Sequence, residues 1–147
     1  MATIAAEDLT ALTDSLHRLL QDRCAEADVR RVMETREGYD PELWRQIAGM
    51  GVTGIVVEEA YGGVGAGPVE LERVMEEAGA VLLPSPLISC VFAAGLIQAL
   101  GDEGAKSRLL PGIADGSKIA TVALTGQKGG WTRNDVEVAA AQGAAES

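Results

Sequence analysis

A glycine-rich run, GIVVEEAYGGVGAGP, over residues 54–68 is the part of the sequence best suited to ligand chemistry. Glycines ahead of a helix start can bring backbone N–H groups close to a pyrophosphate. A dinucleotide-binding register, G-x-G-x-x-G, would need its third glycine at position 68 or 70, where Pro68 and Glu70 stand. We therefore favour a tight turn over direct ligand contact, with glycines that permit positive φ and close packing and with Tyr61 as a half-buried anchor.

Carboxylates and a single histidine are the other side chains with acid–base capacity. Glu72, Glu76 and Glu77 fall opposite the apolar positions of the same stretch, which indicates a solvated helix face rather than a catalytic pair. His17 lies on the polar or boundary face of another helix, with no serine, cysteine or aspartate constellation beside it. We predict no catalytic residue within this chain.

The two cysteines do not suggest a metal site or a disulfide framework. Cys24 and Cys90 are far apart in the sequence, and neither belongs to a CxxC or Cys/His ligand pattern. We therefore predict reduced, partly buried thiols of the kind found in cytosolic proteins, and no metal ligand.

The charge balance limits the classes of partner. The chain has 22 acidic and 12 basic residues, a net charge of −10, and no basic cluster larger than the pair Arg30-Arg31. Nucleic-acid binding needs a concentrated basic footprint, so we expect none. The amino terminus is acidic where a signal peptide is basic, and no run reaches the roughly 18 apolar residues of a membrane span. We expect a soluble cytoplasmic protein without a membrane partner.

Helical periodicity and end signals predict five helices, followed by two short strands. The second helix has the clearest ends, with Asp40 as N-cap, Pro41 in the first turn and Gly51 at the C-cap, while Pro111-Gly112 should end the fifth. The expected helices cover residues 7–27, 41–50, 68–79, 87–100 and 103–110, and the expected β-favouring runs cover residues 119–124 and 136–138.

Three segments, taken in order, resemble the acyl-CoA dehydrogenase family. They are LWRQIAGMGVTGIVVEEAYGGVGAGPVELERVMEEAG, LLPSP and GDEGAKSRLLPGIADGSKIATVALT. The resemblance implies a mainly α fold, in which residues 1–117 form the family's N-terminal helical domain and residues 118–147 contribute the first strands of an incomplete middle β-domain.

The resemblance also implies a function. Family members are flavoproteins that oxidise an acyl-CoA thioester at its α and β carbons, with FAD taking the hydride and a glutamate of the carboxy-terminal domain taking the proton. That glutamate-bearing domain has no counterpart in this chain, so we expect the chain alone to be inactive.

The implied ligand contacts fall on two segments. Val122, Leu124 and Thr125 match the start of the family's flavin-contacting strand, but Gly126 and the glutamine after it replace the usual Glu-Pro, so we expect no FAD binding by this chain alone. In the family, the helix at residues 87–100 lies near the acyl pocket, which makes Val91 and Gly95 the candidate substrate contacts.

Two other functions remain open. The helix at residues 87–100 is apolar nearly all round, and such a helix belongs in a core or against a partner. This favours a noncatalytic interaction module or a supporting subunit of a heteromeric dehydrogenase, and we predict a homo-oligomer or a heteromer. A flavin monooxygenase of the same architecture is the further alternative.

Overall fold

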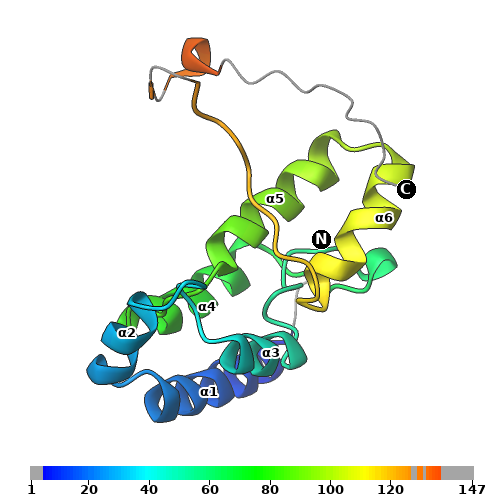
Figure 1. Ribbon diagram of the computed structural model, residues 1–147. Coiled ribbons are helices and arrows are strands. Elements are labelled where there is room, and N and C mark those ends of the chain that lie inside the picture. The colour runs from blue at the N-terminus through cyan, green and yellow to red at the C-terminus, as the bar shows by residue number, and fades with distance from the viewer. Residues whose placement is uncertain (1–4, 127–128, 131, 137–147) are drawn as a thin grey trace, which may run out of the picture.

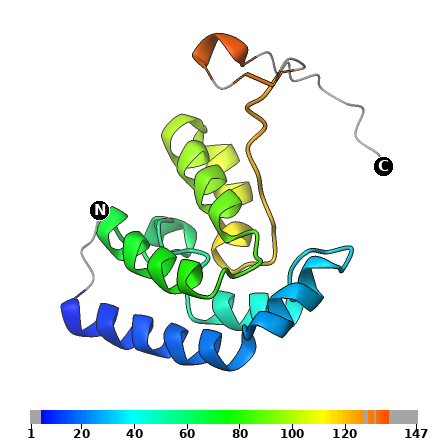
Figure 2. The same cartoon turned by 90° about the vertical axis from the view of Figure 1, so that its left-hand side faces the viewer.

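The computed structural model describes residues 5–126, 129–130 and 132–136, and these residues are helical or irregular. Figures 1 and 2 show a lower layer that contains the first four α-helices, from which α5 and α6 rise side by side. The elements in chain order are α1 (Ala6–Arg23), α2 (Glu26–Met33), α3 (Pro41–Gly49), η1 (Glu59–Tyr61), α4 (Pro68–Ala80), α5 (Leu87–Leu100), α6 (Glu103–Ala114) and η2 (Arg133–Asp135). None of the helices in the described residues is both long and apolar enough to cross a membrane.

The helices α3, α4 and α5 begin where their local signals predicted. Asp40 caps α3, and one of its carboxylate oxygens accepts hydrogen bonds from the N–H groups of Glu42 at 2.8 Å and Leu43 at 3.2 Å. Partial burial opposes ionisation of Asp40, but these two bonds and the nearby Arg23 guanidinium outweigh it and lower the pKa of the carboxyl. The predicted C-cap, Gly51, has a φ of 81°.

The first predicted helix is wrong in its extent, because residues 7–27 do not form one helix. Helix α1 ends at Arg23, the chain turns at Cys24, and α2 begins at Glu26. The turn buries Cys24 and brings Val32 of α2 to 6% exposure, whereas a continuous straight helix would carry its last turns away from the body. Burial of apolar side chains therefore decides the break.

The predicted end of the last helix is also wrong, since α6 runs through Pro111-Gly112 to Ala114. A proline removes one backbone donor, but in the last turn the ladder still closes through the Asp115 N–H, which donates to the Pro111 carbonyl at 3.0 Å. Ile113 and Ala114 are buried at 1% and 5% exposure. Their burial favours one more helical turn.

The predicted strand at residues 119–124 does not form. The segment is extended but unpaired, because no other described segment offers a strand edge to it. Of the second predicted strand, Val136 is irregular and residues 137–138 lie outside the described part of the chain. The mainly α fold is confirmed.

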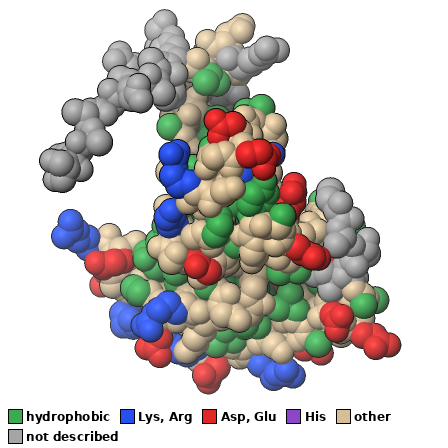
Figure 3. Space-filling view, turned by 90° about the vertical axis from the view of Figure 1, so that its right-hand side faces the viewer, with side chains coloured by type: hydrophobic (Ala, Val, Ile, Leu, Met, Phe, Trp, Pro, Cys, Tyr) green, Lys and Arg blue, Asp and Glu red, His purple; other side chains and the backbone are tan. Residues whose placement is uncertain are grey.

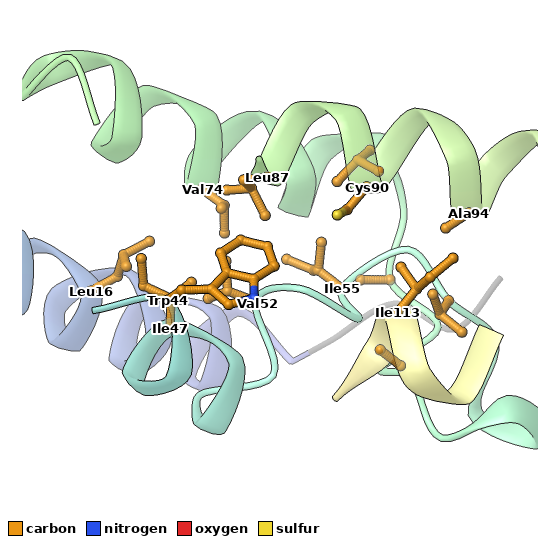
Figure 4. Close-up of a cluster of buried hydrophobic side chains, with 14 of the residues drawn as sticks. Leu16, Trp44, Ile47, Val52, Ile55, Val74, Leu87, Cys90, Ala94 and Ile113 are labelled. Carbon is orange, nitrogen blue, oxygen red and sulfur yellow. The ribbon is translucent and has the colours of Figure 1, made fainter. Parts of the chain in front are cut away.

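One hydrophobic core joins the lower layer to the upright pair of helices. Figure 4 shows side chains of α4 and α5 facing those of α1, α3 and α6, with Val52 and Ile55 between them. The indole of Trp44 packs into this core and donates its N–H to the Gly116 carbonyl at 2.9 Å. This core holds α5 in place, and α5 carries the candidate site.

Candidate functional site

Helix α5 has two apolar faces, and the described residues bury one of them much more completely than the other. Cys90 and Ala94 are fully buried against the core, and Val91 is 8% exposed. On the opposite side, large side chains recur every four residues, so they form one stripe along the helix. This α5 stripe consists of Ile88, Phe92, Leu96 and Leu100, with exposures of 54%, 64%, 43% and 77%.

The extended segment after α6 runs beside α5 (Figure 1). Residues of this segment and of the α5 stripe line an apolar groove. The α5 groove has a volume of about 400 Å³ and no charged lining residue. Its lining residues are Ile88, Ser89, Phe92 and Leu96 on α5 and Thr121, Val122 and Leu124 on the segment. An apolar groove with a few hydroxyl groups suits the hydrocarbon part of a ligand.

The glycine-rich loop adjoins the same helix and is tightly folded. Gly62 and Gly65 have positive φ values of 82° and 70°, and a Cβ on Gly63 would overlap the Val57 carbonyl. Gln98 of α5 fastens the loop by accepting from the Glu58 N–H at 2.8 Å and donating to a neighbouring loop carbonyl at 3.0 Å. The tight turn predicted from the sequence is confirmed.

Tyr61 anchors the loop to α6. Its hydroxyl donates to the Glu103 carboxylate at 2.7 Å, and its ring packs against the core while remaining partly exposed. The hydrogen bond to Glu103, helped by desolvation and by the charges of Glu103 and Glu58, raises the pKa of Tyr61 to about 12. The half-buried anchor predicted for Tyr61 is confirmed.

The structure does not bring the five predicted contact residues together in one site. Val122 and Leu124 line the α5 groove, and Thr125 follows them as an exposed residue. Val91 points into the core. Gly95 lines a separate depression between α5 and the glycine-rich loop.

The sequence predicted an apolar helix at residues 87–100, but it did not predict that Ile88, Phe92 and Leu96 are the residues that line a groove. The signal that could have found them is the four-residue spacing of Ile88, Phe92 and Leu96. The buried side of the same helix is also apolar, so that spacing does not stand out in the sequence.

Acidic side chains do not gather at the groove. Glu70 is 6% exposed, and its carboxylate accepts the Gly67 N–H at 2.9 Å, so it caps α4. Glu72 and Glu76 are exposed, as predicted, while Glu77 binds His17 across α1 and α4 at 2.7 Å. The described residues contain no group of three or more potential metal ligands. Figure 3 shows acidic and basic side chains interspersed over the face drawn, rather than one basic surface.

A comparison with known families decides the kinship of this chain. Residues 6–117 match the model of the acyl-CoA dehydrogenase N-terminal domain. This chain belongs to the acyl-CoA dehydrogenase family. The acyl-CoA dehydrogenase IpdE2 of Mycolicibacterium smegmatis is 31% identical over 118 residues, which cover 80% of this chain and 37% of that protein.

Two solved structures have the same helical arrangement. A Tcur3481-Tcur3483 steroid ACAD variant superposes with a TM-score of 0.73 at 36% identity, over 81% of this chain and 33% of that one. The ChsE4-ChsE5 complex of Mycobacterium tuberculosis superposes with a TM-score of 0.75 at 26% identity, over 89% and 36%. The chain thus spans about a third of the length of these relatives.

Family membership implies FAD in the intact enzyme, and the described residues supply only part of what FAD requires. Val122 and Leu124 offer an apolar edge, and Thr125 offers one exposed hydroxyl. A pyrophosphate needs several N–H or cationic donors. Lys118, at the start of this segment, already donates to the Arg108 carbonyl at 2.9 Å. The described residues therefore do not fit FAD as a complete site.

Proposed function

We propose that this chain is the helical amino-terminal part of an FAD-dependent acyl-CoA dehydrogenase and contributes one wall of its acyl pocket. In this proposal, residues 1–117 form the helical domain and residues 118–147 begin the middle β-domain. The substrate is an acyl-CoA thioester that the assembled enzyme oxidises at its α and β carbons. The observation that carries the proposal is the uncharged α5 groove, with its exposed aromatic and aliphatic side chains.

The chemistry of the groove supports a role in binding rather than in proton transfer. Its polar side chains are the neutral hydroxyls of Ser89 and Thr121, which are poor proton acceptors unless a neighbouring base activates them. The buried carboxylate of Glu70 is already engaged in capping α4. We propose that the base that takes the α proton comes from outside the described residues. We also propose that this chain alone neither oxidises a thioester nor binds FAD stoichiometrically.

The similar structures support a bulky acyl group, since one of them is a steroid ACAD. The large groove-facing side chains Ile88, Phe92 and Leu96 are 43–64% exposed, so they can lose much apolar surface to such a group. Burying one large apolar side chain stabilises a complex by up to about 1.5–3 kcal/mol. A long or polycyclic acyl group is therefore the proposed substrate class.

A second candidate function is a supporting subunit of a heteromeric dehydrogenase. Leu100 extends the α5 stripe beyond the groove and is 77% exposed. The ChsE4-ChsE5 complex is a precedent for association between two family members. In this case the stripe would pack against another subunit, and light scattering with and without that subunit would detect the complex.

Calorimetric titration with decanoyl-CoA tests the acyl-pocket proposal. We expect Phe92→Asp to weaken binding about tenfold, equivalent to about 1.4 kcal/mol, because a carboxylate replaces apolar surface in the groove. Val69→Asp is the matched control, since Val69 is 61% exposed on α4 and does not line the groove. Free coenzyme A measures the contribution of the headgroup. Absent binding, or equal weakening by both variants, would contradict the proposal.

A further inference from the structure

The outer wall of the α5 groove is attached to the helices at few points. The wall is the extended segment of residues 119–125, which carries Val122 and Leu124. Among the described residues, one hydrogen bond joins this stretch to the helical body, from the Ala120 N–H to Cys90 Sγ at 3.4 Å. Ala120 also packs against the core, so the polar attachment of the wall consists of this bond and of the bonds made by Lys118, the residue that precedes the segment.

Cys90 is well placed to receive that bond. It is fully buried, and Figure 4 shows its side chain pointing from α5 towards the core near Ile55 and Ile113. Burial raises the pKa of the thiol, and the Ala120 N–H opposes this only in part. The thiol therefore stays protonated at neutral pH and accepts the Ala120 N–H as a neutral group.

Lys118 fastens the beginning of the segment to α6. Its backbone N–H donates to the Gly112 carbonyl at 2.7 Å, and its ammonium donates to the Arg108 carbonyl at 2.9 Å. Its side chain also covers Gly112, since a Cβ built there would lie 2.6 Å from Lys118 Cδ. Two carbonyls near the end of α6 are thus bound by one lysine.

We propose that Cys90 and Lys118 are positioning residues that hold the 119–125 segment against α5 and α6 and so set the opening of the α5 groove. Cys90 fixes the segment to the helix that carries Phe92 and Leu96, and Lys118 fixes it to α6. Their effect on ligand binding rests on the proposed acyl pocket. Their effect on the position of the segment does not.

Amide hydrogen exchange by NMR on the full chain tests the role of Cys90. Cys90→Ala should speed exchange at Ala120 about fivefold, the factor that corresponds to one lost hydrogen bond. Val74, fully buried in α4, should exchange at its wild-type rate. Cys90→Ser keeps an acceptor and should restore protection. Cys24→Ala, at the other buried cysteine, is the matched control and should leave Ala120 unchanged.

Lys118→Met provides a second test that leaves the core intact. It keeps the apolar stem over Gly112 but removes the ammonium, so exchange at Ala120 should again rise. Lys106→Met is its control, because Lys106 pairs with the exposed Glu103. In both positioning variants, the dissociation constant for decanoyl-CoA should increase, with no such increase in the controls.

The outcomes separate the two proposals. Unchanged Ala120 exchange in folded Cys90→Ala and Lys118→Met, or an equal rise at Val74, would overturn the positioning role. If Cys90→Ala does not fold, Lys118→Met alone decides. A wild-type chain that does not bind decanoyl-CoA, while Ala120 responds as expected, would refute the acyl pocket and leave the positioning role standing.

Discussion

Leu82 occupies a backbone position at which glycine is the usual residue. It follows α4 with a φ of 52°, in the left-handed region. The Leu82 N–H donates to the Gly79 carbonyl at 3.1 Å and the Leu83 N–H to the Ala78 carbonyl at 2.9 Å, which is the hydrogen-bond pattern of a Schellman helix end. The Leu82 side chain is 77% exposed, so few contacts offset the backbone strain.

The expected effect of removing the strain follows from comparing glycine with alanine at this position. Both substitutions remove the same exposed side chain, so the contact term largely cancels. A left-handed conformation costs an L-residue about 1–2 kcal/mol. Glycine loses more conformational entropy on folding than alanine, and this offsets about 0.5–1 kcal/mol of the strain that glycine relieves. Leu82→Gly should therefore be more stable than Leu82→Ala by about 0.5–1 kcal/mol.

Leu100 provides the control, because it is equally exposed at 77% but is the last helical residue of α5, directly before the C-cap Gly101. There the order should reverse, with Leu100→Gly less stable than Leu100→Ala by up to about 1 kcal/mol. Urea unfolding of the four variants, followed by circular dichroism, measures both differences. Glycine variants that are less stable than the alanine variants at both positions would contradict the backbone strain assigned to Leu82.

The hydrophobic core, the N-cap of α3 and the glycine-rich turn can each be tested by substitution. Val91→Asp should unfold the chain, because burying a carboxylate costs several kcal/mol against a total stability of about 5–15 kcal/mol. Leu96→Asp should instead keep the helical circular dichroism spectrum and reduce any self-association seen by light scattering. Asp40→Ala should lower the free energy of unfolding by about 1 kcal/mol at neutral pH. Because folding lowers the pKa of Asp40, this difference between variant and wild type should be complete above the ordinary pKa of an aspartate and should disappear as the pH falls through the lowered native pKa. Urea titrations at several pH values measure it. Gly63→Ala should prevent folding, because the added Cβ would overlap the Val57 carbonyl. At Gly62 an added Cβ has no neighbour within 4 Å, so Gly62→Ala should introduce only the strain of its positive φ and lower the thermal midpoint of unfolding modestly.

Local signals in the sequence were sufficient for the helices α3, α4 and α5 and for the tight turn between α3 and α4. Asp40 and Pro41 act within one helical turn, and Gly62 and Gly63 act within a few residues of loop. Such effects depend on neighbours in the chain, so they can be read without the fold. The three segments that resemble the family also follow one another in the chain, so the sequence by itself was enough to indicate the kinship.

Longer-range packing decided the elements that the sequence misjudged. The break at Cys24 and the extra turn of α6 both bury side chains against distant residues, and neither carries a local signal strong enough to reveal it. The segment at residues 119–124 has the composition of a strand but stays unpaired, because β-propensity expresses itself only where a partner edge is available.

At the candidate site, too, some features follow from the local sequence and others from long-range packing. The sequence determined that α5 is apolar nearly all round, and therefore that it must pack on more than one side. A helix without a polar face has no periodicity to mark which residues point inward. The packing of the other helices against α5 places Val91 in the core and leaves Phe92 and Leu96 in the groove, and this packing depends on residues distant in the sequence.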